Sequence, residues 1–232
     1  MARPARWVTQ INYYDWMSRL KRSLLKLLLV YAPPILLVTA ILIQPWFEAL
    51  LVFPDPIVAA QIAGRCCNTY FGFISNVGVV FWLIAATACS SAALVLAAAS
   101  APSRETAFLA AAAALTFVLA IDDLFMLHER LLPELGVPQP PILIAYVLAG
   151  IAYVVVFYRE IMKRDVEIFA VGLLSLAVSL GIDFFIHERT LAIDLAEDIS
   201  KFFGIAGWAG FHILRAIHAM RSVAATANLS RD

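Results

Sequence analysis

Six apolar runs, each about 20 residues long, alternate with short polar segments along this chain of 232 residues. An α-helix needs roughly 20 apolar residues to cross the hydrocarbon core of a bilayer, which is about 30 Å thick. The pattern therefore predicts an all-α fold, a polytopic membrane helical bundle with six transmembrane helices. The predicted spans cover residues 24–46, 72–98, 106–127, 141–158, 168–187 and 199–217.

The segment before the first span has a different character. Tyr13, Met17, Leu20 and Leu24 recur at helical spacing among basic and aromatic residues. Such a segment is typical of a short helix that lies in the membrane interface. We therefore divide the chain into an N-terminal interfacial amphipathic segment at residues 1–23, a transmembrane domain at residues 24–220 and a tail at residues 221–232.

Composition indicates that lipid is the main solvent. Hydrophobic residues make up 62% of the chain and charged residues only 15%, with a mean hydropathy of +0.86. Soluble proteins carry about 25% charged residues. Positive and negative charges balance, and no basic stripe with interleaved aromatic residues occurs, so we expect no nucleic-acid partner. We interpret the three cysteines, Cys66, Cys67 and Cys89, as packing residues.

The basic residues predict the orientation of the bundle, because cytoplasmic segments of membrane proteins carry an excess of Lys and Arg. One predicted side has only Arg65, Arg130, Arg189 and Lys201. The bias predicts that both termini are cytoplasmic, in a membrane of the bacterial inner-membrane type. The cytoplasmic set comprises Arg3, Arg6, Arg19, Lys21, Arg22, Lys26, Arg104, Arg159, Lys163, Arg164, Arg215, Arg221 and Arg231.

Spans three and five end in related sequences. Residues 122–130 read Asp-Asp-Leu-Phe-Met-Leu-His-Glu-Arg, and residues 183–189 read Asp-Phe-Phe-Ile-His-Glu-Arg. Both helices run outward, and each places an aspartate, a short apolar run and then His-Glu-Arg at the same depth. The hairpins at residues 106–158 and 168–217 are therefore candidates for a weak repeat.

The same helix ends gather ionisable side chains. At a rise of 1.5 Å per residue, Asp122, Asp123 and Asp183 lie roughly 5–8 Å below the outer hydrocarbon boundary, with the His-Glu pairs at that boundary. A charged group inside a bilayer costs about 2.5–3.5 kcal/mol on insertion scales and normally faces a protein interior or a wet cavity. Protons, Lys201 with the arginines, or a bound cation must neutralise the acids gathered there.

One hypothesis is a metal-dependent enzyme, a hydrolase or an oxidoreductase. Asp183 and His187 are four residues apart and Asp122 and Glu129 are seven apart, so each pair shares a helix face. Histidines and carboxylates from several helices suit a divalent metal such as zinc, iron or manganese. Lipid and water would both reach such a site, so we expect a lipid or another amphipathic substrate. The expected metal ligands are Asp122, Asp123, His128, Asp183, His187, Glu197 and Asp198, and the expected catalytic residues are Glu129, Glu188 and Lys201.

Two other functions stay open on the sequence alone. Pairs such as Glu197 and Lys201, four residues apart, stabilise helix ends and suit an accessory subunit that binds partner membrane subunits. Buried aspartates also occur in proton- or cation-coupled transporters. The polar residues gather at one end of the bundle, however, and His212 lies roughly 20 Å from Asp198 along span six.

Span six also carries an unusual density of small residues. Gly204, Gly207 and Gly210 are separated by two residues each, with alanines among them. Small residues let membrane helices approach closely. They predict a packing face, and His212 is expected to be a packed histidine.

Overall fold

The computed structural model describes residues 5–66, 68–100, 103–186, 188 and 190–229. These residues form helices and connections, with no strand among them, which confirms the predicted all-α bundle. Here η1 is a 3-10 turn and η2 is a single π turn. The elements are α1 (Ala5–Ile43), η1 (Ala49–Leu51), α2 (Pro56–Ala63), α3 (Phe73–Ala98), α4 (Ser103–Phe125), η2 (Leu127–Leu131), α5 (Leu132–Glu134), α6 (Gln139–Ile161), α7 (Val166–Phe185) and α8 (Leu191–Leu229).

Five helical segments are long and apolar enough to cross a membrane, and they coincide with the first five predicted spans. The helix α8 contains the sixth predicted span, residues 199–217. It is more polar than the others because His212 and Arg215 interrupt its middle. The five apolar segments are Leu20–Ile43, Phe73–Ala98, Arg104–Phe125, Gln139–Ile161 and Val166–Phe185.

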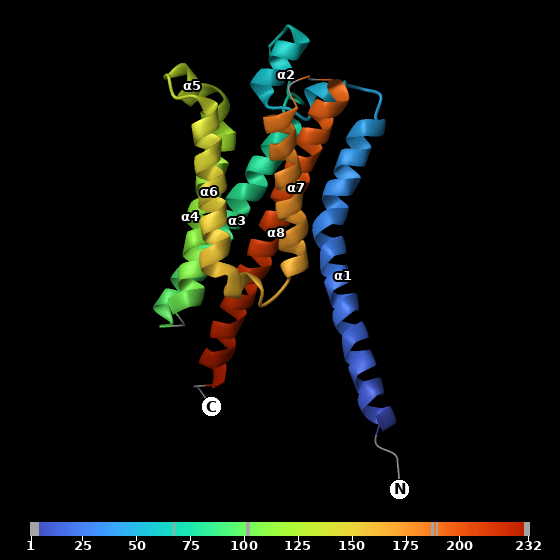
Figure 1. The fold of residues 1–232 in the computed structure, drawn as a ribbon, viewed down its shortest axis with the longest axis vertical. Coiled ribbons are helices and arrows are strands. Elements are labelled where there is room, and N and C mark those ends of the chain that lie inside the picture. Colours follow the sequence, from blue (N-terminus) through green and yellow to red (C-terminus); the bar gives the residue numbers. More distant parts are fainter. Residues whose placement is uncertain (1–4, 67, 101–102, 187, 189, 230–232) are drawn as a thin grey trace.

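The first helix includes both the N-terminal segment and the first predicted span. The helix α1 continues from Ala5 to Ile43 without interruption, so residues 5–23 and the first span form one element. Figure 1 shows its N-terminal part reaching beyond the other helices, at the end of the bundle where the C-terminus also lies. We call this the terminal end. The opposite end, which holds α2, η2 and α5, is the site end.

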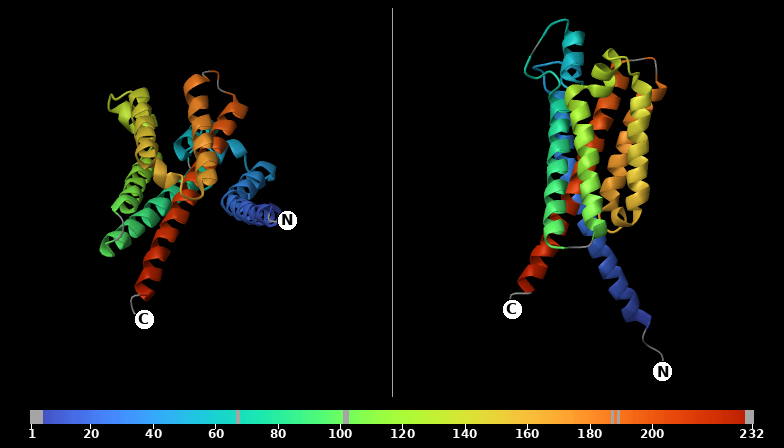
Figure 2. Two further views of the ribbon diagram at one scale, coloured as in Figure 1. Left: turned by 60° about the horizontal axis from the view of Figure 1, so that its bottom comes forward. Right: turned by 90° about the vertical axis from the view of Figure 1, so that its left-hand side faces the viewer.

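The helix α8 is the centre of the bundle. It packs against α7 on one side and α3 on another, and α1 contacts both α8 and α7. The remaining pairs follow outward, since α3 packs on α4 and α6 packs mainly on α4 and η2. Figure 2 shows α8 running past the whole length of the other helices. The helix α6 is therefore anchored to α4 and η2, whereas α7 is anchored to α8.

Glycines allow α7, α8 and α1 to approach one another closely, as the small residues of span six predict. A Cβ atom on Gly172 of α7 would lie 2.9 Å from the backbone nitrogen of Trp208 and 3.0 Å from the Cα of Gly207. A Cβ on Gly207 would lie 2.2 Å from the hydroxyl of Tyr31 on α1. That hydroxyl donates a hydrogen bond to the carbonyl of Ile168, at 3.1 Å. A side chain at either glycine would push the three helices apart.

The buried His212 is a satisfied core residue, which confirms the expectation of a packed histidine. Its Nδ1 lies 2.9 Å from the carbonyl of Trp208, and its Nε2 lies 2.9 Å from the hydroxyl of Tyr153. The carbonyl can only accept, so Nδ1 carries the proton and Nε2 accepts from Tyr153. Both polar atoms of the imidazole are thereby paired inside the apolar core.

Two sets of ion pairs connect the helices at the terminal end. Lys26 of α1 is ion-paired with Asp165, which begins α7. Glu160 of α6 is buried and lies 3.6 Å from Arg104 of α4 and 3.9 Å from Arg215 of α8. Arg215 also stacks over the ring of Phe108, with 5.4 Å between Cζ and the ring centroid. These pairs tie together the ends of helices that diverge toward the site end.

The cysteines only partly follow their interpretation as packing residues. Cys89 is a free thiol buried in the core, as expected. Cys66 is instead disulfide-bonded, so the packing interpretation is wrong for it. Cys67 lies outside the described residues.

Candidate functional site

The site begins where α4 ends. Met126 is buried and adopts a left-handed conformation, with φ of 49° and ψ of 46°, directly after the last residue of α4. Such a conformation costs a residue with a side chain about 1–2 kcal/mol. It turns the chain into the π turn η2, and the backbone N–H of His128 then donates to Oδ1 of Asp122, at 3.1 Å. The imidazole folds back over the end of the helix.

Asp122 holds His128 in one orientation. The Nδ1 atom of His128 is hydrogen-bonded to Oδ2 of Asp122, and the hydroxyl of Tyr146 on α6 donates to Oδ1 at 2.8 Å. Because a carboxylate only accepts, Nδ1 carries a proton and Nε2 is the exchangeable nitrogen. Nε2 lies 3.5 Å from Oε1 of Glu129. The buried carboxylate therefore fixes both the tautomer and the direction of the imidazole.

Asp123, the next residue, faces a different helix. Its Oδ1 lies 3.0 Å from Nζ of Lys201 on α8, and its Oδ2 accepts a hydrogen bond of 2.8 Å from Nε1 of Trp82 on α3. Consecutive helical residues point about 100° apart, which lets Asp122 and Asp123 serve different partners. Of the neutralising groups considered from the sequence, the structure brings Lys201 to Asp123, whereas Asp122 is paired with His128.

Lys201 also connects the cluster to the segment between η1 and α2. Asp55, which precedes α2, is hydrogen-bonded to Ser75 at the start of α3. A small space lined by Asp55, Asp123, Asp198 and Lys201 lies between these elements. The ammonium group thus sits among acids from α2, α4 and α8, and its positive charge is the main compensation for them.

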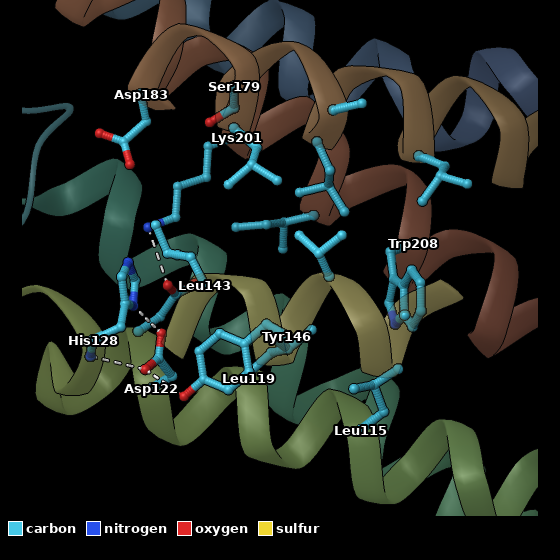
Figure 3. A pocket seen from close by; sticks show the side chains of 18 of the residues that line it. Leu115, Leu119, Asp122, His128, Leu143, Tyr146, Ser179, Asp183, Lys201 and Trp208 are labelled. Carbon is cyan, nitrogen blue, oxygen red and sulfur yellow. Dashed lines mark hydrogen bonds and ion pairs between the residues drawn. The ribbon is translucent and has the colours of Figure 1, made fainter. Parts of the chain in front are cut away.

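Figure 3 shows how the predicted residues of α7 and α8 join this cluster. Asp183 and Ser179 on α7 point toward Lys201, on the opposite wall from His128 and Asp122. Glu197, one turn before Lys201, lines the same cavity. The expectation that acids of separate spans converge at one level of the bundle agrees with this arrangement.

Two predicted residues are not part of the described cluster. Glu188 is exposed in the connection between α7 and α8, and the described lining of the cavity does not include it. His187 lies outside the described residues. The two related segments differ in the backbone directly after the helix, because α4 is followed by the left-handed Met126 and a π turn whereas α7 is followed by Ile186 in an extended conformation, with φ of −106° and ψ of 102°.

Burial and neighbouring charges alter the proton affinity of the η2 residues. Burial raises the pKa of Glu129 to about 7, although Lys201 opposes the shift. For His128, burial lowers the pKa, but the hydrogen bond and the negative charge of Asp122 outweigh it, so the pKa is raised overall. The carboxyl of Glu129 and the imidazole of His128, 3.5 Å apart, are therefore both shifted toward their protonated forms.

A metal site is not evident in the described part of the chain. Among these residues, which exclude His187, no group of three His, Cys, Asp or Glu side chains is arranged to hold a metal ion. The carboxylates of Asp122 and Asp123 are each engaged on both oxygens, by His128 and Tyr146 and by Lys201 and Trp82.

The cluster forms one end of a cavity of about 500 Å³. From the acidic end the cavity runs between α6 and α7 toward Leu115 and Trp208, and its walls there are apolar (Figure 3). Ile151 and Val155 of α6 line the cavity, yet 54% and 69% of their surfaces are exposed. The cavity therefore opens sideways onto an exposed apolar surface of the bundle.

A second, more open hollow of about 370 Å³ lies on the other side of Glu129, between α2 and α5. It is lined by Val58, Arg130, Pro133 and Glu134 besides Glu129 itself. Glu129 thus lines both the cavity between α6 and α7 and the hollow at the site end of the molecule.

Comparison with known proteins gives a family without an assigned activity. A family model described as "Domain of unknown function (DUF8692)" matches residues 16–214, which is most of the chain. The chain belongs to the DUF8692 family. In this DUF8692 protein the matched region includes every residue of the cavity wall from Trp82 to Trp208. No curated protein and no solved structure matches the chain.

Sequence reasoning missed several residues of the DUF8692 site. Tyr146 and Trp82 lie within apolar spans, and neither shows a spacing that links it to Asp122 or Asp123. A polar atom inside an apolar span is the one available signal, because buried Tyr and Trp usually find a hydrogen-bond partner. Asp55 lies between two prolines in the connection before α2, and its approach to Lys201 depends on how residues 48–72 fold over α3 and α8.

Proposed function

We propose that this DUF8692 protein is a membrane enzyme, a hydrolase that takes an amphipathic molecule from the bilayer into the cavity between α6 and α7. The single observation that carries the proposal is the continuity of the cavity. Its apolar walls and its cluster of His128, Asp122, Lys201 and Asp123 belong to one space of about 500 Å³. A molecule with a hydrocarbon chain and a polar group would place the polar group at the cluster.

The arrangement of His128 suits general acid–base chemistry. A base must be held by a third group and must present its lone pair to the reacting proton, and Asp122 holds Nδ1 so that Nε2 is presented. In the proposed reaction Nε2 takes a proton from water while the water oxygen bonds to the electrophilic atom of the substrate. The bond between that electrophilic atom and its leaving oxygen then breaks, and Nε2 gives the proton to the leaving oxygen.

Lys201 and Glu129 have supporting roles in this proposal. The ammonium group of Lys201, held by Asp123 at 3.0 Å, is positioned to stabilise negative charge that develops on a substrate oxygen. Glu129 has a pKa of about 7, so it is present in both protonation states at neutral pH and can exchange a proton with His128. The polar hollow beyond Glu129 offers a route for water that does not cross the apolar part of the cavity.

A comparison of turnover tests this function. Purified protein in nanodiscs is incubated with a lipid extract from the membranes of the expression host, in water enriched in oxygen-18. We expect at least one amphipathic product to appear with the heavy oxygen for the native protein and not for His128→Asn. The matched control is His218→Asn, which makes the same change at the terminal end of α8 and should leave turnover unchanged. Equal labelling of products by the native protein and His128→Asn would rule out the assigned role of His128.

A further inference from the structure

The apolar part of the cavity is about one lipid leaflet deep. Measured from Lys201 of the cluster, the lining on α8 extends to Trp208, and on α6 it extends from Leu143 to Val155. At 1.5 Å per residue these segments rise about 10 Å and about 18 Å along their helices. Half of a hydrocarbon core of about 30 Å is about 15 Å. A chain that enters with its polar group at the cluster therefore reaches the far end of the cavity near the middle of the membrane.

A rigid side chain closes that far end. Trp208 is buried, and its Nε1 donates a hydrogen bond of 2.8 Å to the hydroxyl of Thr116 on α4. Its ring also packs against Trp82, with centroids 6.1 Å apart, and against Phe169, with centroids 5.5 Å apart. Contacts with three helices fix the indole, so the floor cannot recede to admit a longer chain without breaking them.

The width of the cavity depends on a glycine that has no packing role. Gly150 of α6 lines the cavity, and a Cβ atom built on it would meet no heavy atom within 4 Å. In this respect it differs from Gly172 and Gly207, where a Cβ would collide with a neighbouring helix. Because Gly150 has no side chain, free space remains between α6 and α7, one helical turn from Tyr146 toward the terminal end.

The volume admits one chain. Counting roughly 30 Å³ for each water-sized group, a cavity of about 500 Å³ holds on the order of 17 non-hydrogen atoms. That number suits one hydrocarbon chain with a compact polar group. An extended chain advances about 1.2 Å per bond, as a peptide backbone does, so a depth of about 15 Å corresponds to roughly 12 carbons.

We infer that the cavity selects a single-chain amphipathic molecule and limits the length of its chain, with Trp208 as the floor and Gly150 as the residue that sets the free width. This inference rests on the proposed function, because it describes the substrate of the same site. A compact headgroup with hydroxyls is the best match for the polar end, since hydroxyls can donate hydrogen bonds to the carboxylates there.

Monoacylglycerols provide the probe. The full-length protein is placed in dioleoyl phosphatidylcholine nanodiscs with an equimolar mixture of octanoyl, decanoyl, dodecanoyl, myristoyl, palmitoyl and stearoyl monoacylglycerol. Bound species are quantified by mass spectrometry of the isolated protein. The test variant is Gly150→Phe, and the matched control is Gly181→Phe. A Cβ on Gly181 also meets nothing within 4 Å, but the described lining of the cavity does not include this residue of α7.

We expect the native protein and Gly181→Phe to retain decanoyl to myristoyl chains at least tenfold over the stearoyl chain. Gly150→Phe should retain the dodecanoyl and myristoyl chains about tenfold less than the native protein does. If the native protein binds these molecules but Gly150→Phe leaves the distribution unchanged, the length limit is refuted and the proposed function stands. If the native protein retains no monoacylglycerol above empty nanodiscs, the inferred substrate class is refuted, and the oxygen-18 comparison with His128→Asn decides the proposed function separately.

Discussion

The imidazole of His128 is hydrogen-bonded to the carboxylate of Asp122, six residues earlier in the chain, because the left-handed Met126 reverses the chain between them. Asp122 is buried and His128 is partly buried at the end of α4, and the second oxygen of Asp122 accepts from both the backbone of His128 and the hydroxyl of Tyr146. This contact orients Nε2 toward Glu129 and the cavity. The proposed function depends on this hydrogen bond more than on any other contact.

Removing the charge of Asp122 should therefore impair turnover strongly. Asp122→Asn keeps the size of the side chain but no longer favours the tautomer that presents Nε2 as a base. We expect turnover to fall about 10²–10⁴-fold, the usual contribution of a general base. Tyr146→Phe removes one hydrogen bond from the same carboxylate and should cost about tenfold or less. Oxygen-18 incorporation measured by mass spectrometry compares the two, and an equal loss in both variants would argue against the orienting role.

The pair formed by Lys201 and Asp123 should be visible as a coupling energy. Lys201→Met leaves a carboxylate without its cation, and we expect a lower melting temperature in detergent. Asp123→Asn in the same chain should recover part of the loss. Charged pairs in contact usually show coupling of about 0.5–3 kcal/mol in such double-mutant cycles. Strictly additive effects of the two substitutions would mean that the ion pair, at 3.0 Å, contributes nothing to stability.

The stability of the protein should depend on pH through Glu129. Its pKa is raised from 4.5 to about 7 by burial, so the folded state binds a proton more tightly than the unfolded state. The resulting stabilisation is complete below the unfolded pKa and is lost as the pH rises through about 7. As the pH rises from about 5 to about 8, we expect the melting temperature of the native protein to fall relative to that of Glu129→Gln. Parallel pH profiles of the two proteins would contradict the shift.

The close contact of α7 and α8 predicts different tolerances for two glycines. Gly172→Ala would place its Cβ 2.9 Å from the backbone of Trp208, and we expect a loss of about 1–3 kcal/mol from overpacking. Gly181→Ala meets no atom within 4 Å and should be neutral, or stabilising by up to about 1 kcal/mol because alanine favours helix. Thermal melting in detergent distinguishes them. Equal melting temperatures would contradict the packing.

The bias of basic residues predicts the orientation of the bundle in the membrane. Both termini lie at the same end of the molecule (Figure 1), where most of the lysines and arginines gather. A fluorescent protein fused after Asp232 should fold and fluoresce in the cytoplasm, whereas an alkaline phosphatase fused there should be inactive. The site end should show the reverse behaviour when the phosphatase is inserted at Gly136, in the connection after α5. The opposite pattern would place the site end in the cytoplasm.

Much of the fold could be predicted from the sequence because span length and apolarity determine it. The convergence of Asp122, Asp123 and Asp183 also followed, since counting residues along a helix sets their depth. The seven-residue spacing from Asp122 to Glu129 was a poor guide to contacts, however, because it assumes an uninterrupted helix. Nothing in the pattern indicates that Met126 breaks α4 and brings His128, rather than Glu129, onto Asp122.

The lateral cavity could not be predicted either. It exists because α6 is anchored to α4 while α7 is anchored to α8, and such pairing is decided by tertiary packing. The sequence does not indicate that Gly150 lines a cavity, since a glycine in a membrane span more often marks close helix packing. Trp208 and Thr116 are far apart in the chain, and their hydrogen bond becomes visible only when α4 and α8 are placed side by side.

Photolabelling tests most directly whether an amphipathic molecule occupies this cavity with its polar group at His128. A monoacylglycerol with a diazirine at the end of its dodecanoyl chain is added to the protein in nanodiscs, activated by light and located by peptide mass spectrometry. The account predicts labels near Leu115 and Trp208, which are competed by the unlabelled molecule and reduced in Gly150→Phe. Labels confined to the outward apolar face of α1, at residues such as Leu28 and Leu36, would contradict it.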